Sequence, residues 1–418
     1  MKKKIIFTIL FLFIFSILVI GISSCSSNLK TDISEKLPVK PIEEIIKEHY
    51  SKNVKTNKAS VIYNEKLENV GKINKNVHLE LLETEINKDT LYFQFQYNNK
   101  TYNIKYGNVD VYKNTIKKET RHKNYVPFDE SIVTKKSYEL FKDKKSVYKF
   151  NNGPIELPIY IKEKGAYGVV IDDILYFIKS SDVEDVKYSK NAKVKKEDRI
   201  PTFAYHFIYD PKVEKCDEII CHTIDQVEEQ LDYLKKNNYF TLTMDEFEMF
   251  IDKKLNVVDN SILLTLDDGW FAMNAKKLFT EKEMNLSMFI VSSWFDPTTF
   301  VTDYVEVHSH SHDMHNVGAC PKGQGGGIQC LDEKKLLEDF KLSRERTLYT
   351  TAFCYPFYEY NEYTISVLKK AGFTLGFGGL YEGGSYKTYP GYDKFRIPRI
   401  TLLSTTTLSD LEDALKSY

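Results

Sequence analysis

The sequence lacks an excess of charge of either sign. Its 418 residues carry 58 lysine and arginine side chains against 59 aspartate and glutamate side chains. Proteins that bind nucleic acid usually present a strongly basic surface, so this balance predicts no nucleic-acid partner. Long apolar runs are scarce too. The clearest one, residues 5–22, directly follows the basic start Met1-Lys2-Lys3-Lys4.

This N-terminal stretch has the pattern of an export signal, although an apolar run of this length could also remain as a transmembrane anchor. The sequence Ile22-Ser23-Ser24-Cys25 resembles a bacterial lipobox, which implies cleavage before Cys25 and a lipid on its thiol. We therefore expect a lipoprotein signal peptide over residues 1–25 and a flexible tether over residues 26–43. The body of the protein is then extracytoplasmic, lipid-anchored to the membrane and facing the cell wall.

Cysteine is sparse, with six residues in the chain. Apart from the lipobox cysteine, two pairs each flank a short loop: Cys216 with Cys221, and Cys320 with Cys330. Local disulfides are plausible in an exported protein and would stiffen both loops. Cys354 lies in an apolar stretch, which favours a small buried residue, with metal ligation as the alternative.

Two segments before residue 190 resemble each other. The spacing of tyrosine, isoleucine, lysine and valine from Tyr102 to Val109 recurs from Tyr176 to Val183. Apolar and polar residues alternate in both segments, with Asn-Asn or Asp-Asp breaks, as in short antiparallel strands of small barrels. We expect two small all-β modules of SH3-like type, at residues 44–118 and 137–190. A tandem pair either binds the cell wall or serves as a spacer.

From residue 200 onward, apolar strands alternate with amphipathic helices, which indicates an α/β domain of parallel βα units. In such a domain the functional residues gather at the C-terminal ends of the strands. Strands are predicted at residues 200–206, 261–266, 286–291, 351–355 and 373–377, and helices at residues 223–236, 244–253, 271–282, 332–348 and 361–371.

One of these strands ends in two adjacent carboxylates, Asp267 and Asp268, followed by Gly269. Neighbouring carboxylates repel each other unless positive charge lies beside them. A metal ion solves this, with one aspartate as ligand and the other free as a base. A solvated turn is the alternative for this stretch alone.

Histidine is also scarce, with nine residues, yet four of them fall within residues 306–315. Imidazoles with a carboxylate form a site typical of zinc. We therefore predict a site for Zn²⁺ or another divalent transition metal. Two spacings compete for its histidine ligands: His308 with His312, and His310 with His315.

The segment Thr265-Leu266-Asp267-Asp268-Gly269 resembles the signature of NodB-type polysaccharide deacetylases, carbohydrate esterase family 4. The histidine segment is similar to the second motif of that family. Its Asp313-Met314 and Glu306-Val307 match the poly-N-acetylglucosamine deacetylase branch, which favours His310 and His315. The resemblance covers about residues 200–400. It implies an irregular (β/α) barrel over residues 200–418, Asp267 as the general base, and Asp268, His310 and His315 as metal ligands.

Two features of the family are missing. Its third motif usually carries an arginine before proline, whereas Cys354-Tyr355-Pro356 has none, and the Leu-x-Leu-His that supplies the acid near the C-terminus is absent. The branch that opens with Tyr-His implies His206 as the acid, with a structural strand-end histidine as the alternative. Arg399 is the candidate for the missing cation.

The resemblance implies a metal-dependent hydrolase that removes N-acetyl groups from N-acetylglucosamine in peptidoglycan or a surface glycan. Backbone N–H groups near Tyr358 would stabilise the oxyanion. The exposed ring of Trp270 would stack on a sugar, whereas Trp294 is expected to pack in the core. The alternatives are a catalytically inactive wall-binding lipoprotein, and another metallohydrolase, such as an amidase, on the same barrel.

Overall fold

The computed structural model of the chain describes residue 44 and residues 53–87, 90–113, 120–193, 195–379 and 386–416. The predicted signal peptide, Cys25 and the tether up to residue 43 lie outside these ranges. No helix within them is long and apolar enough to cross a membrane.

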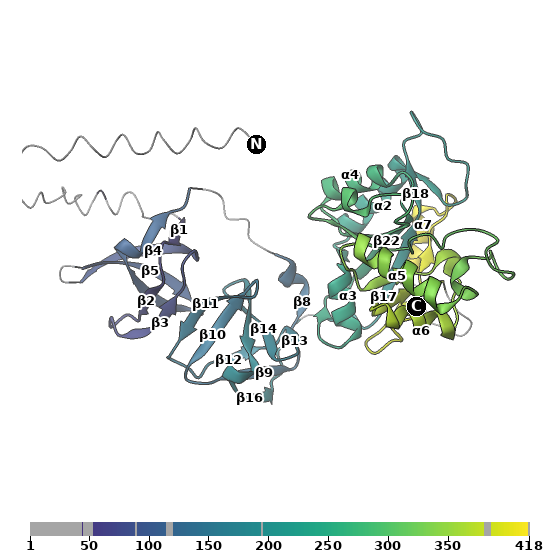
Figure 1. Cartoon of the computed structure of the whole chain (residues 1–418). Helices are drawn as coiled ribbons and strands as arrows, with labels where there is room; N and C mark the ends of the chain where they lie inside the picture. Colours follow the sequence, from purple (N-terminus) through teal and green to yellow (C-terminus); the bar gives the residue numbers. More distant parts are fainter. Residues whose placement is uncertain are drawn as a thin grey trace, which may run out of the picture. The chain divides into compact units, whose positions relative to one another are not determined.

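Most of the N-terminal strands form one 12-stranded antiparallel sheet (Figure 1). Strands with alternating burial, such as β2 (Ser60–Tyr63), place one face in the core and the other toward solvent. The order is β13 (Ile161–Glu163), β14 (Ala166–Ile171), β15 (Ile174–Lys179), β10 (Tyr138–Lys142), β11 (Lys145–Phe150), β3 (Asn69–Ile73), β2 (Ser60–Tyr63), β6 (Lys100–Lys105), β5 (Thr90–Tyr97), β4 (His78–Asn87), β1 (Asn53–Thr56) and β7 (Val109–Val111).

The two predicted repeats fold alike locally. In the first, β6 passes through a single 3₁₀ turn at Tyr106–Asn108 into β7. In the second, β15 passes through the same kind of turn at Ser180–Asp182 into β16 (Val183–Tyr188). The predicted sequence repeat therefore corresponds to a repeated strand–turn–strand unit.

The repeats are joined where β11 pairs with β3, with Phe150 opposite Gly71. A Cβ atom on Gly71 would lie 2.3 Å from the Lys149 carbonyl oxygen, so only glycine allows the strands to approach this closely. The SH3-like type and the separate module limits stay predictions, because the sheet runs through both repeats.

A three-stranded sheet with the order β12 (Glu156–Pro158), β9 (Glu130–Thr134) and β16 stands beside the long sheet in the topology. A shorter pairing links the N-terminal strands to the C-terminal region. Strand β8 (Tyr125–Val126) pairs with β21 (Asn256–Val257). Nearby, Arg121 forms an ion pair with the buried Glu246, whose carboxylate also accepts a hydrogen bond from the Tyr125 hydroxyl at 2.6 Å.

The C-terminal region is built on a largely parallel sheet. Its order is β26 (Leu375–Phe377), β25 (Ala352–Cys354), β24 (Val305–Ser309), β23 (Leu286–Ile290), β22 (Ser261–Asp268), β17 (Ile200–Tyr205) and β27 (Lys387–Thr388), with β20 (Phe240–Thr241) beside β22 and β28 (Ile400–Thr401) beside β17. Only β27 pairs antiparallel in this sheet. A parallel bridge between Phe377 and Ile397 connects the β26 edge to the segment that leads into β28. A separate pair consists of β18 (Phe207–Tyr209) and β19 (Cys221–Thr223).

Figure 1 shows the helices around β17 and β22. They are α2 (Ile224–Lys236), α3 (Met244–Ile251), α4 (Ala272–Lys282), α5 (Glu333–Arg346), α6 (Glu362–Lys370) and α7 (Leu408–Lys416). Thr223 begins α2 with a capping box, as its position in the sequence predicts. All ten strands and helices predicted for this region are present, and their ends agree within two residues.

Candidate active site and metal centre

The paired aspartates lie at the end of β22, all of whose residues are buried. Side chains of neighbouring residues in an extended strand normally point to opposite faces. Asp268 has a φ of +72°, in the left-handed region, and Gly269 follows with a φ of +114°. This turn breaks the alternation, and both carboxylates come within 4.8 Å of ligand atoms on His310.

Asp267 is held by Arg399, the cation suggested by the sequence. The guanidinium donates from Nη1 to Oδ1 and from Nη2 to Oδ2, both at 2.7 Å, and both side chains are buried. Burial on its own raises the pKa of Asp267, but the charge and hydrogen bonds of Arg399 outweigh it and keep the pKa well below its usual range. Asp267 is therefore ionised. The guanidinium also lies over the Tyr358 ring, 4.8 Å from its centroid.

Asp268 faces two histidines. Its Oδ1 atom lies 3.3 Å from Nε2 of His310 and 3.3 Å from Nε2 of His315. The three residues form one of two groups in the described part of the chain that could hold a metal ion. Of the two competing spacings, this is the one with His310 and His315.

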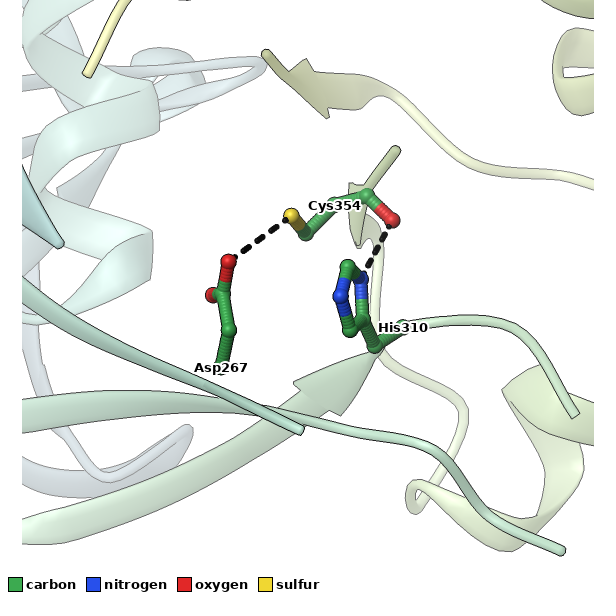
Figure 2. Close-up of side chains that lie close together, drawn as sticks. All are labelled: Asp267, His310 and Cys354. Carbon is green, nitrogen blue, oxygen red and sulfur yellow. Dashed lines mark hydrogen bonds between the residues drawn. The ribbon is translucent and has the colours of Figure 1, made fainter. Parts of the chain in front are cut away.

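The orientation of these rings fits a metal ligand set. Nδ1 of His310 lies 2.9 Å from the Cys354 carbonyl oxygen, which only accepts hydrogen bonds (Figure 2). Nδ1 therefore carries a hydrogen, and Nε2 is the ring nitrogen that faces Asp268. Burial lowers the pKa of His310, but Cys354 and Asp268 outweigh burial and raise the pKa well above its usual value, so a bound cation would replace the proton on Nε2. Burial and the charge of the neighbouring His310 lower the pKa of His315 to about 4, so the His315 ring is neutral near pH 7. Buried Oδ1 of Asp268 has no hydrogen-bond partner, and a cation would satisfy all three atoms.

The other group combines Asp267, His310 and Cys354. Figure 2 shows the Cys354 thiol directed at the Asp267 carboxylate, with 3.5 Å between sulfur and Oδ2. Arg399 donates to both carboxylate oxygens and to this sulfur, at 2.8 Å. A metal here would lie against a guanidinium, so repulsion disfavours it. Cys354 is a buried thiol, as the apolar stretch around it predicts.

The alternative histidines are bound elsewhere. Nδ1 of His308 lies 2.6 Å from the Thr350 hydroxyl, and its Nε2 lies 3.4 Å from the Glu306 carboxylate. His312 uses Nδ1 to contact the Ser292 hydroxyl at 3.0 Å. Neither ring belongs to a candidate metal group in the described residues.

His206 directly follows β17, so it precedes Asp267 in the chain, whereas His310 and His315 follow Asp267. The Nε2 atom of His206 is 3.8 Å from Oδ2 of Asp267. Burial lowers the pKa of His206 even though the Asp267 charge acts in the other direction, so the ring is neutral near pH 7. The structure thus brings the candidate acid next to the candidate base.

Aromatic side chains lie beside the ligands. Trp270 is 49% exposed, and its ring centroid lies 6.2 Å from that of Trp294. The prediction that Trp294 packs in the core is wrong: its side chain is 37% exposed and lies 5.4 Å from the His315 ring. The turn that follows β23 displaces it from the core. Phe357 packs on His315, with 4.2 Å between ring centroids.

The backbone near Tyr358 is expected from the sequence to supply N–H groups for an oxyanion. The amide N–H of Tyr358 donates to the Tyr355 carbonyl within the turn, so this group is not free for an oxyanion. The Tyr358 hydroxyl contacts Thr401 at 2.9 Å. Any contact with substrate would therefore come from another amide or from the exposed part of the ring.

Asp339, which no sequence motif indicated, is a buried carboxylate that accepts hydrogen bonds from the backbone of the histidine segment. Burial raises its pKa to about 6. Asp339 and Ser343 lie on the apolar face of α5 with Leu336 and Phe340. Polar residues at apolar positions of an amphipathic helix were the available signal.

Both predicted disulfides are present, Cys216–Cys221 and Cys320–Cys330. The second closes the loop that follows His315. Gly327 within this loop donates its N–H to the Met314 carbonyl. The loop is thereby attached next to a candidate metal ligand.

Comparison with known proteins identifies the family that the C-terminal region resembles. A family model described as polysaccharide deacetylase matches residues 254–376. The chain is 24% identical over 249 residues to a poly-beta-1,6-N-acetyl-D-glucosamine N-deacetylase of Staphylococcus aureus (strain MRSA252), covering 52% of this chain and 81% of that protein. It is 22% identical over 196 residues to YxkH of Bacillus subtilis (strain 168), whose name marks it as a candidate polysaccharide deacetylase. That match covers 44% of this chain and 66% of YxkH.

Among solved structures, a de-N-acetylase of Aggregatibacter actinomycetemcomitans is 19% identical with a TM-score of 0.45, over 52% of this chain and 100% of that one. The C-terminal region, with its parallel sheet and paired Asp-Asp and His-His motifs, is a polysaccharide deacetylase domain. This domain is of the NodB type, and the proteins similar to it include a poly-beta-1,6-N-acetyl-D-glucosamine N-deacetylase.

Proposed function

We propose that the protein is a metal-dependent hydrolase that removes N-acetyl groups from N-acetylglucosamine residues of a cell-wall polysaccharide. The observation that carries the proposal is the pair of sites at the end of β22. Asp267 is buried and paired with Arg399, while the adjacent Asp268 faces the imidazoles of His310 and His315. Neighbouring carboxylates with separate partners suit a base and a metal ligand.

The ligands of the metal are Asp268, His310 and His315, and Zn²⁺ or another divalent transition metal suits this donor set. When bound, the metal acts as a Lewis acid that polarises the amide carbonyl and lowers the pKa of water. The hydrogen bond from Nδ1 of His310 to the Cys354 carbonyl supports this assignment because it orients the ring with Nε2 toward Asp268.

Asp267 accepts a proton from the water that attacks the amide carbon. Arg399 orients the carboxylate and keeps it ionised until that step. His206, 3.8 Å from Oδ2, delivers a proton to the sugar nitrogen as the C–N bond breaks. Because the free ring is neutral, the proton that Asp267 takes from water can reach the amine through His206. The products are acetate and the protonated amine, so one water is consumed and no proton is left over.

Trp270 and Tyr358 are the candidate substrate contacts, and the exposed ring of Trp294 extends the aromatic surface beside Trp270. Aromatic faces suit the apolar faces of sugar rings. The staphylococcal relative acts, by its name, on poly-beta-1,6-N-acetyl-D-glucosamine. Its similarity favours a surface polymer of this kind, with peptidoglycan as the other candidate substrate.

The proposed organisation follows the sequence. Residues 1–25 are a lipoprotein signal peptide with lipidation at Cys25, and residues 26–43 tether the protein to the outer face of the membrane. Two SH3-like modules, at residues 44–118 and 137–190, lie between the anchor and an irregular (β/α) barrel of NodB type at residues 200–418. The modules would hold the enzyme near the wall.

The test is acetate release from poly-N-acetylglucosamine and from peptidoglycan by the zinc-loaded protein. Asp267→Asn should abolish release and keep the metal, because it removes the base and no ligand. His206→Ala should lower kcat by roughly 10²–10⁴, the usual contribution of a general acid, with metal content unchanged. His308→Ala is the matched control and should retain both. Wild-type protein that binds zinc and releases no acetate from either polymer would favour an inactive wall-binding protein instead.

A further inference from the structure

The loop that carries the two histidine ligands is supported by helix α5. The buried face of this helix contains two polar residues, Asp339 and Ser343. Burying a carboxylate costs free energy unless hydrogen-bond donors replace its water. The groups that donate hydrogen bonds to Asp339 therefore show which segment of the chain this carboxylate stabilises.

Both oxygens of Asp339 accept backbone hydrogen bonds from the histidine loop. Oδ1 accepts from the N–H of His312 at 2.9 Å, and Oδ2 accepts from the N–H of Asp313 at 2.7 Å. These two amides lie between His310 and His315 in the chain, so the carboxylate fixes the segment that sets the ligand spacing.

Further contacts lock the same turn. The hydroxyl groups of Ser309 and Ser343 are hydrogen-bonded to each other. Ser311 has a left-handed φ of +70°, and its N–H donates to the Ser309 hydroxyl at 3.2 Å. The Ser311 hydroxyl then accepts from the N–H of Met314 at 3.1 Å. The strained turn is held by side chains, since successive amides point inward rather than along a helix or strand.

We propose that Asp339 is a positioning residue for the metal centre, which it maintains by holding the His312 and Asp313 amides so that His310 and His315 converge on Asp268. The inference rests on the proposed metal site. Without the carboxylate, two buried N–H groups lose their acceptors, and the turn must rearrange to reach water. The distance between the two histidines is then no longer fixed before metal binds.

Zinc affinity, measured on the full chain by competition with a chromophoric chelator in the absence of substrate, tests the proposal. Asp339→Asn and Asp339→Ala should weaken zinc binding roughly 10–100-fold, as loss of outer-shell support typically does. Saturating zinc should restore most of kcat to Asp339→Asn, because the residue touches no reacting atom. Glu338→Gln is the matched control: it removes an exposed carboxylate next to Asp339 on the same helix and should leave the affinity unchanged.

The variant Asp268→Asn distinguishes a failure of the proposed metal site from a failure of the proposed role of Asp339. If it lowers zinc affinity while both Asp339 variants bind as tightly as wild type, the metal site stands and the role of Asp339 is overturned. If Asp268→Asn also binds zinc normally, the metal site itself is wrong. Circular dichroism establishes that each variant is folded. Should Asp339→Ala unfold, the nearly isosteric Asp339→Asn decides the result.

Discussion

Asp267 and Asp268 are adjacent carboxylates with different chemistry because their partners come from different parts of the chain. Arg399, which follows the bridge residue Ile397, supplies two hydrogen bonds to Asp267. Asp268 instead meets His310 and His315, which follow β24. The fixed positive charge of Arg399 keeps Asp267 ionised and uses both of its oxygens as hydrogen-bond acceptors. Within the residues that the structure describes, Asp268 has no such partner among the guanidinium groups and can bind a cation.

Replacing Arg399 by Gln tests the ion pair. Asp267 would remain buried without its cation, so its pKa should rise and the acidic limb of the pH–rate profile should move to higher pH. Stability should fall by roughly 3–5 kcal/mol, because one partner of a buried pair is removed. Thermal unfolding and a pH profile of kcat/KM measure both effects.

Arg396→Gln is the control for that experiment, because Arg396 forms ion pairs with the more exposed Glu362 and Asp393 rather than with Asp267. It should leave the acidic limb in place. An unshifted limb in Arg399→Gln as well would show that Asp267 is not the group whose ionisation limits the rate at low pH.

Sequence predicted the site residues that stand in local motifs and missed those that act through the fold. Asp267, Asp268, His310 and His315 form short patterns, and the structure brings them together. The Asp339 contacts cross 26 and 27 residues to the amides of Asp313 and His312. A backbone amide leaves no mark in the sequence, so only the position of Asp339 on an apolar helix face could have indicated a role.

At the scale of elements, the loop between β24 and α5 contains both the candidate metal ligand His315 and the Cys320–Cys330 disulfide. Gly326 packs against Phe357, where a Cβ atom would lie 2.9 Å from the ring, and Phe357 in turn covers His315. The Cys320–Cys330 bond spans 10 residues of this loop. The disulfide therefore restricts the motion of the loop whose Gly326 supports the Phe357 ring against His315.

Removing this disulfide by Cys320→Ser with Cys330→Ser should destabilise the loop. The chain-entropy account assigns roughly 2–3 kcal/mol to a crosslink of this span. We expect faster proteolysis within residues 318–327 and weaker zinc binding, because the His315 ring loses its fixed support. Cys216→Ser with Cys221→Ser is the matched control, since that disulfide lies before α2. Equal zinc affinity in all three proteins would refute a link between the loop and the ligand.

Elements of the C-terminal region were predictable because each has its own periodicity and capping residues. Thr223, Thr243, Asp332 and Asn361 each cap a helix through the side chain. Strand pairing across the N-terminal region was not predictable in the same way. The contact of β11 with β3 joins residues more than 70 positions apart and depends on register, which short alternating strands specify weakly.

On the scale of the whole molecule, the continuous N-terminal sheet is stabilised by a shared aromatic core. Tyr97 of β5 stacks on Phe150 of β11, with 4.7 Å between ring centroids. Its centroid lies 5.3 Å from Tyr148 and 6.5 Å from Tyr176. A side chain of the first repeat thus packs on three side chains of the second.

Replacing Tyr97 by Ala should therefore weaken both repeats. Loss of a large buried aromatic side chain typically costs roughly 3–5 kcal/mol, and here the cavity would open between the halves of one sheet. Hydrogen exchange followed by mass spectrometry on the full chain should show faster exchange in β5 and β6 and also in β10, β11 and β15. Tyr188→Ala, which removes a 76% exposed ring, should change neither. Faster exchange confined to the first repeat would mean that the two repeats are independent modules, as the sequence pattern by itself predicts, and that the shared core contributes little to holding them together.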